Sequence, residues 1–499
     1  MENYDKKIAV IGGGVAGLSA GIHSLLNGYD VSIYESHSRV GGNLTAWNKK
    51  GCVIDNCIHW LTGTNPNSEE YAKWTEIGAF DGIEFHRPES LFTFSSGNKK
   101  LSLKRSSDEF FEDMLKISPD DEKRILSLKR GVEAAKRIFG IGGKDGDQRS
   151  TGVKRLFDYL KFGSYHLISI GSLGKKFKDP FLKKFICGFI GESFSALALV
   201  SVYATFTGGN GDTPKGGSNA LCEAIKRKYI SLGGKIYTGK KLIKAENEGE
   251  NKVALYFESG EKITSDFAVI TADPLSIYRK IISSPMPRSL QKTYDNRSIR
   301  RFSAIQAAIK TEGAVPFKGD LILEADEVLK KEFGCFNVLF REFSNQENFA
   351  PENANVIVVE CFIPTERAKN IIALKENPRL YEIYKKRFFS TVKNLFESNV
   401  SPLNGEMIDC WTSATYNRFT QSVNGEFMSY ILPPRFIPPN VPMTASGYKR
   451  IVIASQGLKP IGGLPTALNS GKAAAEKIMK IDGLKKPFSL PFKVKTVKI

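Results

Sequence analysis

The sequence lacks the cysteine density of a disulfide-stapled protein. Its 499 residues include seven cysteines, at positions 52, 57, 187, 222, 335, 361 and 410, which are too few and too dispersed for a disulfide framework. The odd count is typical of a reducing compartment, so we expect a cytoplasmic protein. Cys52, Cys57 and His59 match no common zinc spacing and lack a fourth ligand. The sequence therefore predicts no metal site.

Long hydrophobic runs are also missing. The best candidate, residues 193–206, is uncharged for about 14 residues, whereas a membrane-spanning helix needs roughly 20. The N-terminal apolar run follows an acid-containing start, residues 1–5, and fits a first strand and helix rather than a signal peptide. We therefore expect neither a signal peptide nor a transmembrane helix.

Acidic residues are in deficit. The chain has 71 Lys and Arg against 53 Asp and Glu, a formal net charge of +18, and such a balance suggests nucleic acid, anionic lipid or an acidic substrate. The lysines are scattered and no nucleic-acid module is recognisable, so we expect no nucleic-acid partner. Two interpretations stay open: a lysine bias without function, or a peripheral contact with an anionic membrane surface at the inner membrane face.

What the sequence does contain is a dinucleotide-binding pattern at its start. An apolar strand at residues 8–11 is followed by Gly12, Gly14 and Gly17, then by a second strand that ends in Glu35. This order is that of the βαβ unit that binds a dinucleotide, because the glycines allow a tight turn, close approach of the pyrophosphate and close helix–strand packing. The acid suits a ribose diol and disfavours a 2′-phosphate.

Four further segments carry a family resemblance. Residues 35–43 resemble the acid-then-GG signature of flavin oxidoreductases, and residues 51–60 resemble the "GxxxDxGxH" segment of the phytoene desaturase family, closest to its retinol saturase and carotenoid isomerase branch. Residues 214–221 and 457–472 are similar to that family's "PxGG…L" turn and C-terminal flavin motif. Many members carry Arg where this chain has Asn43, and Gly where it has Cys57.

The resemblance implies FAD as the cofactor and a set of residues that bind it. These are Gly12, Gly14, Val15, Ala16, Gly17, Glu35, Ser36, Gly41, Gly42, Asn43, Ile58, His59, Leu242, Gly463, Leu464, Pro465 and Ala467. The N-terminus of the last helix would point the positive end of the helix dipole at the flavin.

The resemblance also suggests two catalytic candidates. His59 is the first candidate for a proton donor or acceptor, the alternative being an oriented structural histidine. Lys459 is the second, the alternatives being contact with a flavin carbonyl or with solvent.

The implied fold class is α/β, with a Rossmann-type, GR2-like FAD-binding domain interleaved with an α+β substrate domain. We expect the FAD-binding domain at residues 1–75, 209–275 and 445–482, the substrate domain with a helical lobe at 76–208 and 276–444, and a basic tail at 483–499. Patterning predicts strands at 235–237, 240–246, 253–257, 302–310, 337–341, 355–362 and 450–454, and helices at 219–232, 380–396 and 466–479. Residues 76–208 are rich in helix formers.

The resemblance implies an FAD-dependent oxidoreductase acting on carbon–carbon bonds, by desaturation, saturation or isomerisation, of a long lipophilic polyene such as a carotenoid or retinoid. Its partners would be that hydrophobic small molecule and a separate electron donor or acceptor: quinone, oxygen or a reductant. The alternatives are a flavin amine oxidase, with Trp60 and Trp411 in an aromatic cage, and a non-catalytic flavin- or lipid-binding protein. The aromatic block at residues 181–206 would line a tunnel or form an ordinary buried helix pair with a solvated basic face, and residues 492–499 allow the same two interpretations.

Overall fold

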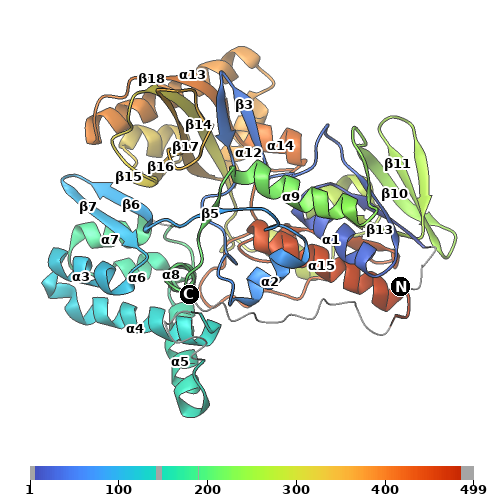
Figure 1. The fold of residues 1–499 in the computed structure, drawn as a ribbon, viewed down its shortest axis with the longest axis horizontal. Helices are drawn as coiled ribbons and strands as arrows, with labels where there is room; N and C mark the ends of the chain where they lie inside the picture. Colours follow the sequence, from blue (N-terminus) through green and yellow to red (C-terminus); the bar gives the residue numbers. More distant parts are fainter. Residues whose placement is uncertain (1–5, 142–148, 189, 485–499) are drawn as a thin grey trace.

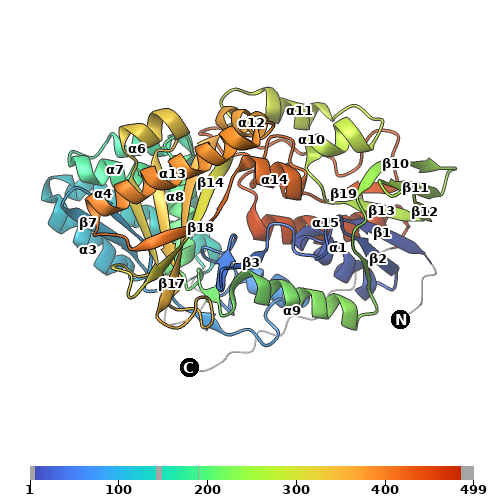
Figure 2. The same cartoon turned by 90° about the horizontal axis from the view of Figure 1, so that it is seen from above.

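The computed structural model describes residues 6–141, 149–188 and 190–484. It has two lobes side by side, and the chain passes between them several times, so that its first and last helices lie together in one lobe (Figure 1). Seen from above, a long sheet with its helices occupies one end and the smaller strands occupy the other (Figure 2). The predicted α/β class is confirmed by this architecture.

The first lobe is built on a five-stranded parallel sheet in the order β19-β13-β1-β2-β9. Its strands are β1 (Lys7–Ile11), β2 (Asp30–Tyr34), β9 (Lys235–Tyr237), β13 (Phe267–Ile270) and β19 (Ile451–Ile453). Helices α1 (Val15–Leu26), α9 (Gly217–Ser231) and α15 (Gly463–Ile481) pack on one face. The antiparallel strands β10 (Leu242–Glu248), β11 (Lys252–Phe257) and β12 (Lys262–Ser265) cover the other.

Alternation along β1 explains these two layers. Ile8 and Val10 pack in the same buried cluster as α1 and α15, whereas Ala9 and Ile11 pack with the β10–β12 sheet. Successive side chains of a strand point to opposite faces, so a continuously apolar strand is buried on both. The turn that follows β1 therefore lies at the carboxyl edge of the sheet, where such folds bind ligands.

The second lobe contains a seven-stranded sheet in the order β18-β14-β17-β16-β15-β6-β7. Its strands are β6 (Ser90–Ser96), β7 (Lys99–Lys104), β14 (Phe302–Glu312), β15 (Asp320–Glu324), β16 (Asn337–Glu342), β17 (Ala354–Pro364) and β18 (Gly405–Trp411). Helices α12 (Thr365–Leu374) and α13 (Pro378–Asn399) cover its outer face. The other face packs, in part, on the hairpin of β3 (Ala46–Lys49) and β4 (Cys52–Asp55).

A helical lobe packs beside β6 and β7. It comprises α3 (Ser107–Ile117), α4 (Glu122–Phe139), α5 (Gly152–Ser164), α6 (Ile170–Gly174), α7 (Pro180–Gly188) and α8 (Ala196–Thr207). Phe181, Phe185, Tyr203 and Phe206 are buried in its core. The aromatic block at 181–206 is therefore an ordinary buried helix pair and not a tunnel wall. Residues 492–499 lie outside the described part of the chain.

The remaining elements are short connectors. They are α2 (Glu69–Glu76), β5 (Phe85–His86), β8 (Thr213–Pro214), α10 (Pro274–Ser276), α11 (Arg288–Asp295), α14 (Ser413–Thr420), and the turns of helix η1 (Pro119–Asp121), η2 (Tyr165–Leu167), η3 (Ile277–Ile281), η4 (Leu329–Phe333) and η5 (Gln456–Leu458).

The description of residues 76–208 as rich in helix formers did not include the strands β6 and β7. β6 forms an antiparallel hairpin with β7 and also pairs with β15, more than two hundred residues later in the chain. The hairpin does have a local signal, the two-residue Gly97-Asn98 turn between two apolar-rich runs, which the prediction overlooked. No helix within the described ranges has both the length and the apolar character needed to cross a membrane.

Candidate functional site

Two glycines of the first turn are required by the packing of the protein itself. Gly12 has φ +96°, and a Cβ there would lie 2.4 Å from the Thr271 hydroxyl oxygen. A Cβ on Gly17 would lie 1.9 Å from the carbonyl oxygen of Gly12. Any side chain at Gly17 would therefore push α1 away from β1.

Gly14 is different, because nothing in the protein requires a glycine there. Its backbone is extended, with φ −70° and ψ −179°, and an added Cβ would lie 3.8 Å from its nearest neighbours, the Gly41 carbonyl oxygen and the Gly42 Cα. Gly13 and Gly14 lie beside Gly41 and Gly42, since the Gly41 amide donates to the Gly13 carbonyl at 2.9 Å. The space above Gly14 is thus a cradle that a side chain would fill, and it suits a phosphate.

The start of α1 supports this fit. Val15 and Ala16 form its first turn and are buried, and within the described residues no side chain caps this helix end. The first amides of a helix have no partner inside it, and together with the helix dipole they favour an anion.

Glu35 is held rigidly at the end of β2. Its Oε2 accepts a hydrogen bond from the Gly13 amide at 2.7 Å, and its Oε1 accepts from the His37 amide at 2.9 Å and from the Ser36 hydroxyl at 3.0 Å. A carboxylate has about four acceptor positions, so one remains for a ribose hydroxyl. Leu242 is buried at the start of β10, and the Lys240 amide two residues earlier donates to the Glu35 carbonyl at 2.7 Å.

Asn43 connects the first turn to the last helix. Its Nδ2 donates to the Phe427 carbonyl at 3.1 Å, and Nε2 of Gln456 donates to the same carbonyl at 2.9 Å. Oε1 of Gln456 accepts from the Gly463 amide at 2.7 Å. Sequence analysis missed Phe427 and Gln456, because their role depends on a backbone carbonyl that no motif encodes.

The turn before α15 is strained. Ile461 has φ +71°, which is a genuine outlier for a β-branched residue, and its amide donates to the Tyr430 carbonyl at 2.7 Å. The hydroxyls of Ser429 and Tyr430 are buried with no hydrogen-bond partner among the described residues. Strain and orphaned polar groups of this kind cluster at binding sites. Leu464, Pro465 and Ala467 follow in the first turns of α15 and are half-buried.

His59 contacts two carboxylates of the seven-stranded sheet. Its Nε2 lies 2.9 Å from Oε2 of Glu360, and its Nδ1 lies 3.7 Å from Oδ2 of Asp320. Glu360 is buried, and among the described residues its Oε2 has no aligned hydrogen bond. Burial raises the pKa of Glu360 to about 7, and the nearby Arg341 lowers it only in part. The carboxyl thus gains and loses a proton near neutral pH.

Arg341 organises the same cluster. Its Nε and Nη2 lie 3.0 and 3.4 Å from the two oxygens of Asp320, and its Nη1 donates to the Ile58 carbonyl at 2.9 Å. Burial lowers the pKa of Arg341 to about 10, so the guanidinium stays charged at neutral pH. This cation fixes both the segment that carries His59 and one of its two carboxylates.

Strand alternation explains why these groups converge. On β15, β16 and β17 the alternate apolar residues pack under α12 and α13, which leaves Asp320, Arg341 and Glu360 on the opposite face. The three residues belong to three strands that are adjacent in the sheet. His59 reaches them from the segment after β4.

A cavity of about 270 Å³ lies at this junction. It is lined from the first lobe by Asp55, Ile58, His59 and Gly217, and from the sheet by Asp320, Arg341, Glu342 and Phe343, among others. Ligand pockets usually measure about 300–1,000 Å³ and are mainly apolar. A small cavity with three carboxylates does not suit a long polyene, but it allows proton exchange at His59.

Cys57 and Asp55 stabilise the same segment. Asp55 accepts hydrogen bonds from the amide and hydroxyl of Ser218, both at 2.6 Å, and from the Cys57 amide at 3.0 Å. Burial raises the pKa of the Cys57 thiol, so it stays protonated. The described part of the chain shows no group of three or more His, Cys, Asp or Glu side chains that could hold a metal.

Lys459, Trp60 and Trp411 do not join the cluster around His59. Lys459 is exposed and is not among the residues that line the His59 cavity. Trp411 meets Trp47 edge-on with ring centroids 4.9 Å apart and donates to Oδ1 of Asn56 at 2.6 Å, whereas Trp60 packs against the helical lobe. Within the described chain, Trp60 and Trp411 therefore do not pair as a cage.

Comparisons with known proteins place this geometry in a family. The model of flavin containing amine oxidoreductases matches residues 15–479. The 4,4'-diaponeurosporene oxygenase of Staphylococcus aureus strain MW2 is 20% identical over 504 residues, which cover 95% of this chain and 98% of that protein. The enzyme of the same name from Staphylococcus haemolyticus is 22% identical over 302 residues, covering 58% and 60%.

Solved structures of low identity share the fold. An oxidoreductase from Methanosarcina mazei has a TM-score of 0.62 at 16% identity, covering 95% of this chain and all of that one. An engineered triple mutant of putrescine oxidase has a TM-score of 0.61 at 15% identity, covering 95% and 99%. The predictions of an FAD cofactor and of an oxidoreductase are confirmed. This chain belongs to the flavin-containing amine oxidoreductase family and is an FAD-dependent oxidoreductase.

Proposed function

We propose that this oxidoreductase adds or removes hydrogen across carbon–carbon bonds of a long lipophilic polyene, such as a carotenoid or retinoid. The observation that carries the proposal is the similarity to 4,4'-diaponeurosporene oxygenases over 95% of the chain. The motifs at residues 35–43, 51–60, 214–221 and 457–472 support it, because they resemble the phytoene desaturase family.

The chain's own residues would hold the cofactor from two sides. Gly14, Gly42 and the free amides of α1 would receive the pyrophosphate, and Glu35 would accept a ribose hydroxyl. The start of α15 would face the flavin with its positive end. When bound, FAD supplies the transfer of hydrogen to or from carbon. The other residues that the family resemblance assigns to the cofactor remain predictions.

His59 would hold or move a proton at the junction of the two lobes. Its imidazole lies between Glu360 and Asp320, and the 2.9 Å contact at Nε2 gives it a proton partner that titrates near neutral pH. General acids and bases work best with a pKa near the operating pH. Arg341 holds Asp320 and the Ile58 carbonyl, so the imidazole keeps its orientation. The exposed position of Lys459 supports contact with solvent rather than a catalytic role.

The direction of hydrogen transfer decides the electron partner. A desaturase passes electrons to a quinone or to oxygen, a saturase receives them from a reductant, and an isomerase has no net electron flow. We infer a cytoplasmic enzyme that takes its hydrophobic substrate at an anionic membrane surface.

A flavin amine oxidase is the second candidate. It is favoured by the acid-lined cavity beside His59, whose volume of about 270 Å³ suits a small cation better than a polyene. The absence of a Trp60–Trp411 pair among the described residues counts against the aromatic cage of that class.

One experiment separates the candidates. The purified yellow protein is mixed anaerobically with a detergent-dispersed carotenoid, and the flavin absorbance and the product mass are followed. We expect a flavin spectral change with a product that differs by two hydrogens, or an isomer formed only with reduced flavin. Amines that bleach the flavin and release peroxide on aeration would establish the second candidate. A flavin that no substrate or donor reduces would indicate a non-catalytic binding protein.

A further inference from the structure

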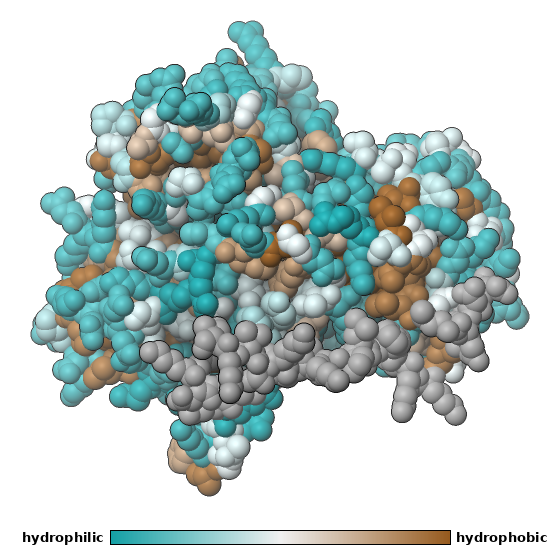
Figure 3. All heavy atoms as spheres, viewed as in Figure 1, coloured by the Kyte–Doolittle hydropathy of each residue, from teal (hydrophilic) through white to brown (hydrophobic). Residues whose placement is uncertain are grey.

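Helix α5 carries an apolar stripe on its exposed side. Val153, Leu156, Phe157 and Leu160 are 59% to 71% exposed, and their spacing of three and four residues places them on one face of the helix. The helix projects from the lower end of the molecule in Figure 1, and Figure 3 shows apolar atoms at that end. Single exposed apolar residues are normal, but a contiguous stripe marks a binding surface.

The inner face of α5 shows that this orientation is built in. Asp158 is buried and receives two hydrogen bonds from Arg137 of α4, at 2.9 and 2.7 Å. Phe162 meets Phe139 of α4 with ring centroids 5.4 Å apart. The helix therefore attaches to the protein largely through a charged pair and presents its larger apolar face outward, the reverse of an ordinary surface helix.

Two more exposed apolar side chains lie just beyond the C-terminal end of α5. Leu167 is exposed, and Ile437, at 85%, is the most exposed large apolar residue described. Their segments are joined, because Arg435 donates from its amide to the His166 carbonyl at 2.8 Å and from Nε to the Leu167 carbonyl at 3.3 Å. We define the α5 surface as Val153, Leu156, Phe157, Leu160, Leu167 and Ile437.

Two exposed cations, Lys154 and Arg155, stand next to the apolar side chains on α5. A third cation of the helix, Lys161, lies on its inner side, where its Nζ donates to the Ser127 hydroxyl of α4 at 2.9 Å. Apolar side chains flanked by Lys and Arg are the pattern of helices that lie in the interface of anionic membranes.

We propose that the α5 surface docks on an anionic lipid bilayer and places its apolar side chains in the headgroup–acyl boundary. A second copy of this chain fits less well, because two such surfaces would bring like charges together and each chain already carries +18. This docking rests on the proposed function and deepens it. A polyene substrate dissolves in the bilayer, so a docked enzyme would take it up there.

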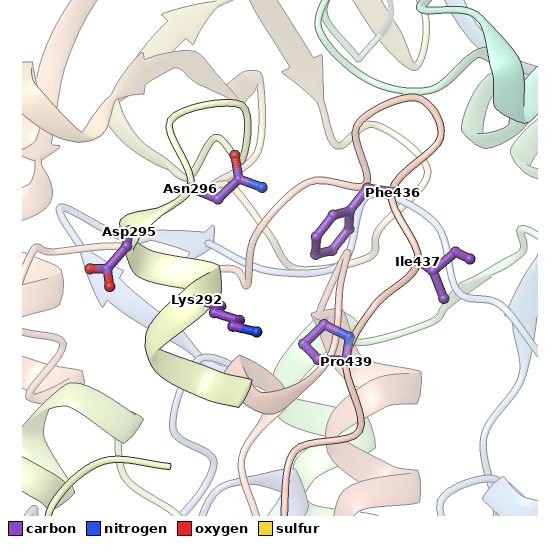
Figure 4. Close-up of a pocket in the computed structure, with 6 residues that line it drawn as sticks. All are labelled: Lys292, Asp295, Asn296, Phe436, Ile437 and Pro439. Atoms are coloured by element: carbon purple, nitrogen blue, oxygen red, sulfur yellow. The ribbon is translucent and has the colours of Figure 1, made fainter. Parts of the chain in front are cut away.

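The segment that carries Ile437 also reaches the flavin end of the molecule. The Tyr430 carbonyl accepts the Ile461 amide in the turn before α15. Between residues 436–439 and the end of α11 lies an open groove of about 420 Å³. Figure 4 shows the Phe436 ring turned toward α11 and Ile437 turned away from it. One short segment thus connects the α5 surface to the strained turn of the candidate site.

Vesicle flotation of the holoprotein tests the proposal. Vesicles of phosphatidylcholine alone are compared with vesicles that contain phosphatidylglycerol, at low and high salt. We expect flotation with the anionic vesicles only, and a loss of about fivefold in partitioning for each basic side chain that is neutralised.

The decisive variant is Leu156→Ser with Phe157→Ser. Each removes a side chain that would be buried in the bilayer, so partitioning should fall by about tenfold or more. The control is Leu380→Ser with Ile383→Ser on α13, which are 48% and 52% exposed and lie at the other end of the molecule in Figure 1. The control should float like the unmodified protein, and both variants should keep the melting temperature and flavin spectrum.

Three outcomes would overturn the docking surface: no flotation of the unmodified protein, equal loss in both double variants, or a dimer in solution that only the α5 variant dissociates. Turnover separates this proposal from the proposed function. If detergent-dispersed polyene reacts but the protein does not float, docking is wrong and the function stands. If the protein floats as expected but no polyene reacts, docking stands and the substrate assignment is wrong.

Discussion

The proposed cofactor end, formed by the Gly12–Gly17 turn, Glu35 and the start of α15, and the His59 junction are built in opposite ways. The cofactor end is made of backbone: the glycines of one turn, the amides of α1 and the start of α15, with Glu35 held by neighbouring amides. The His59 junction is made of ionisable side chains from three strands and the segment after β4, and two of them, Arg341 and Glu360, are buried. At the glycine turns an added side chain either collides with the backbone, as at Gly17, or fills the proposed phosphate cradle, as at Gly14, whereas the junction responds to protonation. The two regions should therefore fail in different ways when altered.

The largest effect is expected for Gly17→Ala. Its Cβ would lie 1.9 Å from a backbone oxygen of β1's turn, so α1 must shift, and overpacking of this kind costs typically 1–3 kcal/mol and more when backbone has to move. Thermal unfolding should show a melting temperature lowered by several degrees or no folded protein at all. The matched change Gly163→Ala, which meets nothing within 4 Å, should leave the melting temperature nearly unchanged. Equal melting temperatures for the two variants would contradict the structural role of Gly17.

Gly14→Glu should break the cofactor end without unfolding it. The nearest protein atoms are 3.8 Å from a Cβ at this position, so the apoprotein should melt close to the unmodified one. The new carboxylate would occupy the phosphate cradle, and loss of the anion contacts should weaken FAD binding by about 3 kcal/mol or more, roughly a hundredfold. Fluorescence titration with FAD measures this. Stoichiometric FAD in the purified variant would show that the cradle is elsewhere.

Glu360→Gln should change pH dependence rather than folding. The folded-state pKa of Glu360 is raised to about 7, above its ordinary value of about 4.3, so the folded protein holds a proton that the unfolded chain releases. Between about pH 4.3 and 7 the free energy of unfolding should fall as pH rises, by about 4 kcal/mol in total for this group. The Gln variant should lack this fall.

Denaturant melts at pH 5 and pH 8 compare the two proteins, and kcat/KM against pH adds a functional readout. We expect the step near pH 7 to move or vanish in Glu360→Gln, while Glu324→Gln, which alters a part-exposed carboxyl on β15, two strands away in the same sheet, retains it. If the pH dependence of stability and of kcat/KM were the same in Glu360→Gln as in the unmodified protein, Glu360 would not be the proton partner of His59.

The smallest effect is expected for Asn43→Ala. The variant loses one hydrogen bond to the Phe427 carbonyl, worth about 1 kcal/mol, and Gln456 still donates to that oxygen. FAD affinity should fall by less than about tenfold. A loss as large as that of Gly14→Glu would mean that Asn43 contacts the cofactor directly.

The same difference explains what the sequence could predict. The turn at Gly12–Gly17 and the acid at Glu35 follow from spacing, whereas the start of α15 was identified by the family resemblance of residues 457–472. The strands 235–237 and 302–312 follow apolar patterning and were also predicted, the second two residues short. Turns and strands that depend on neighbouring residues can therefore be predicted from the sequence.

The rest depends on contacts between distant segments. Glu360 and Arg341 look like ordinary exposed charges in a strand until the sheet order places them beside His59, about 300 residues away in the chain. β6 is a different case, because its hairpin with β7 carries a local Gly97-Asn98 turn signal that the helix-rich composition of residues 76–208 obscured. For residues 181–206 the sequence allowed either a tunnel lining or a buried helix pair, and the packing of their aromatic side chains in the helical core supports the second.

The most direct test of the central claim is the spectrum of the bound flavin on anaerobic mixing with a carotenoid. The account predicts that the purified protein holds one FAD and that its absorbance changes with the substrate as a product altered by two hydrogens appears, or that reduced flavin isomerises the polyene. A protein that stays colourless with added FAD, or whose flavin responds to amines and never to a polyene, would contradict it.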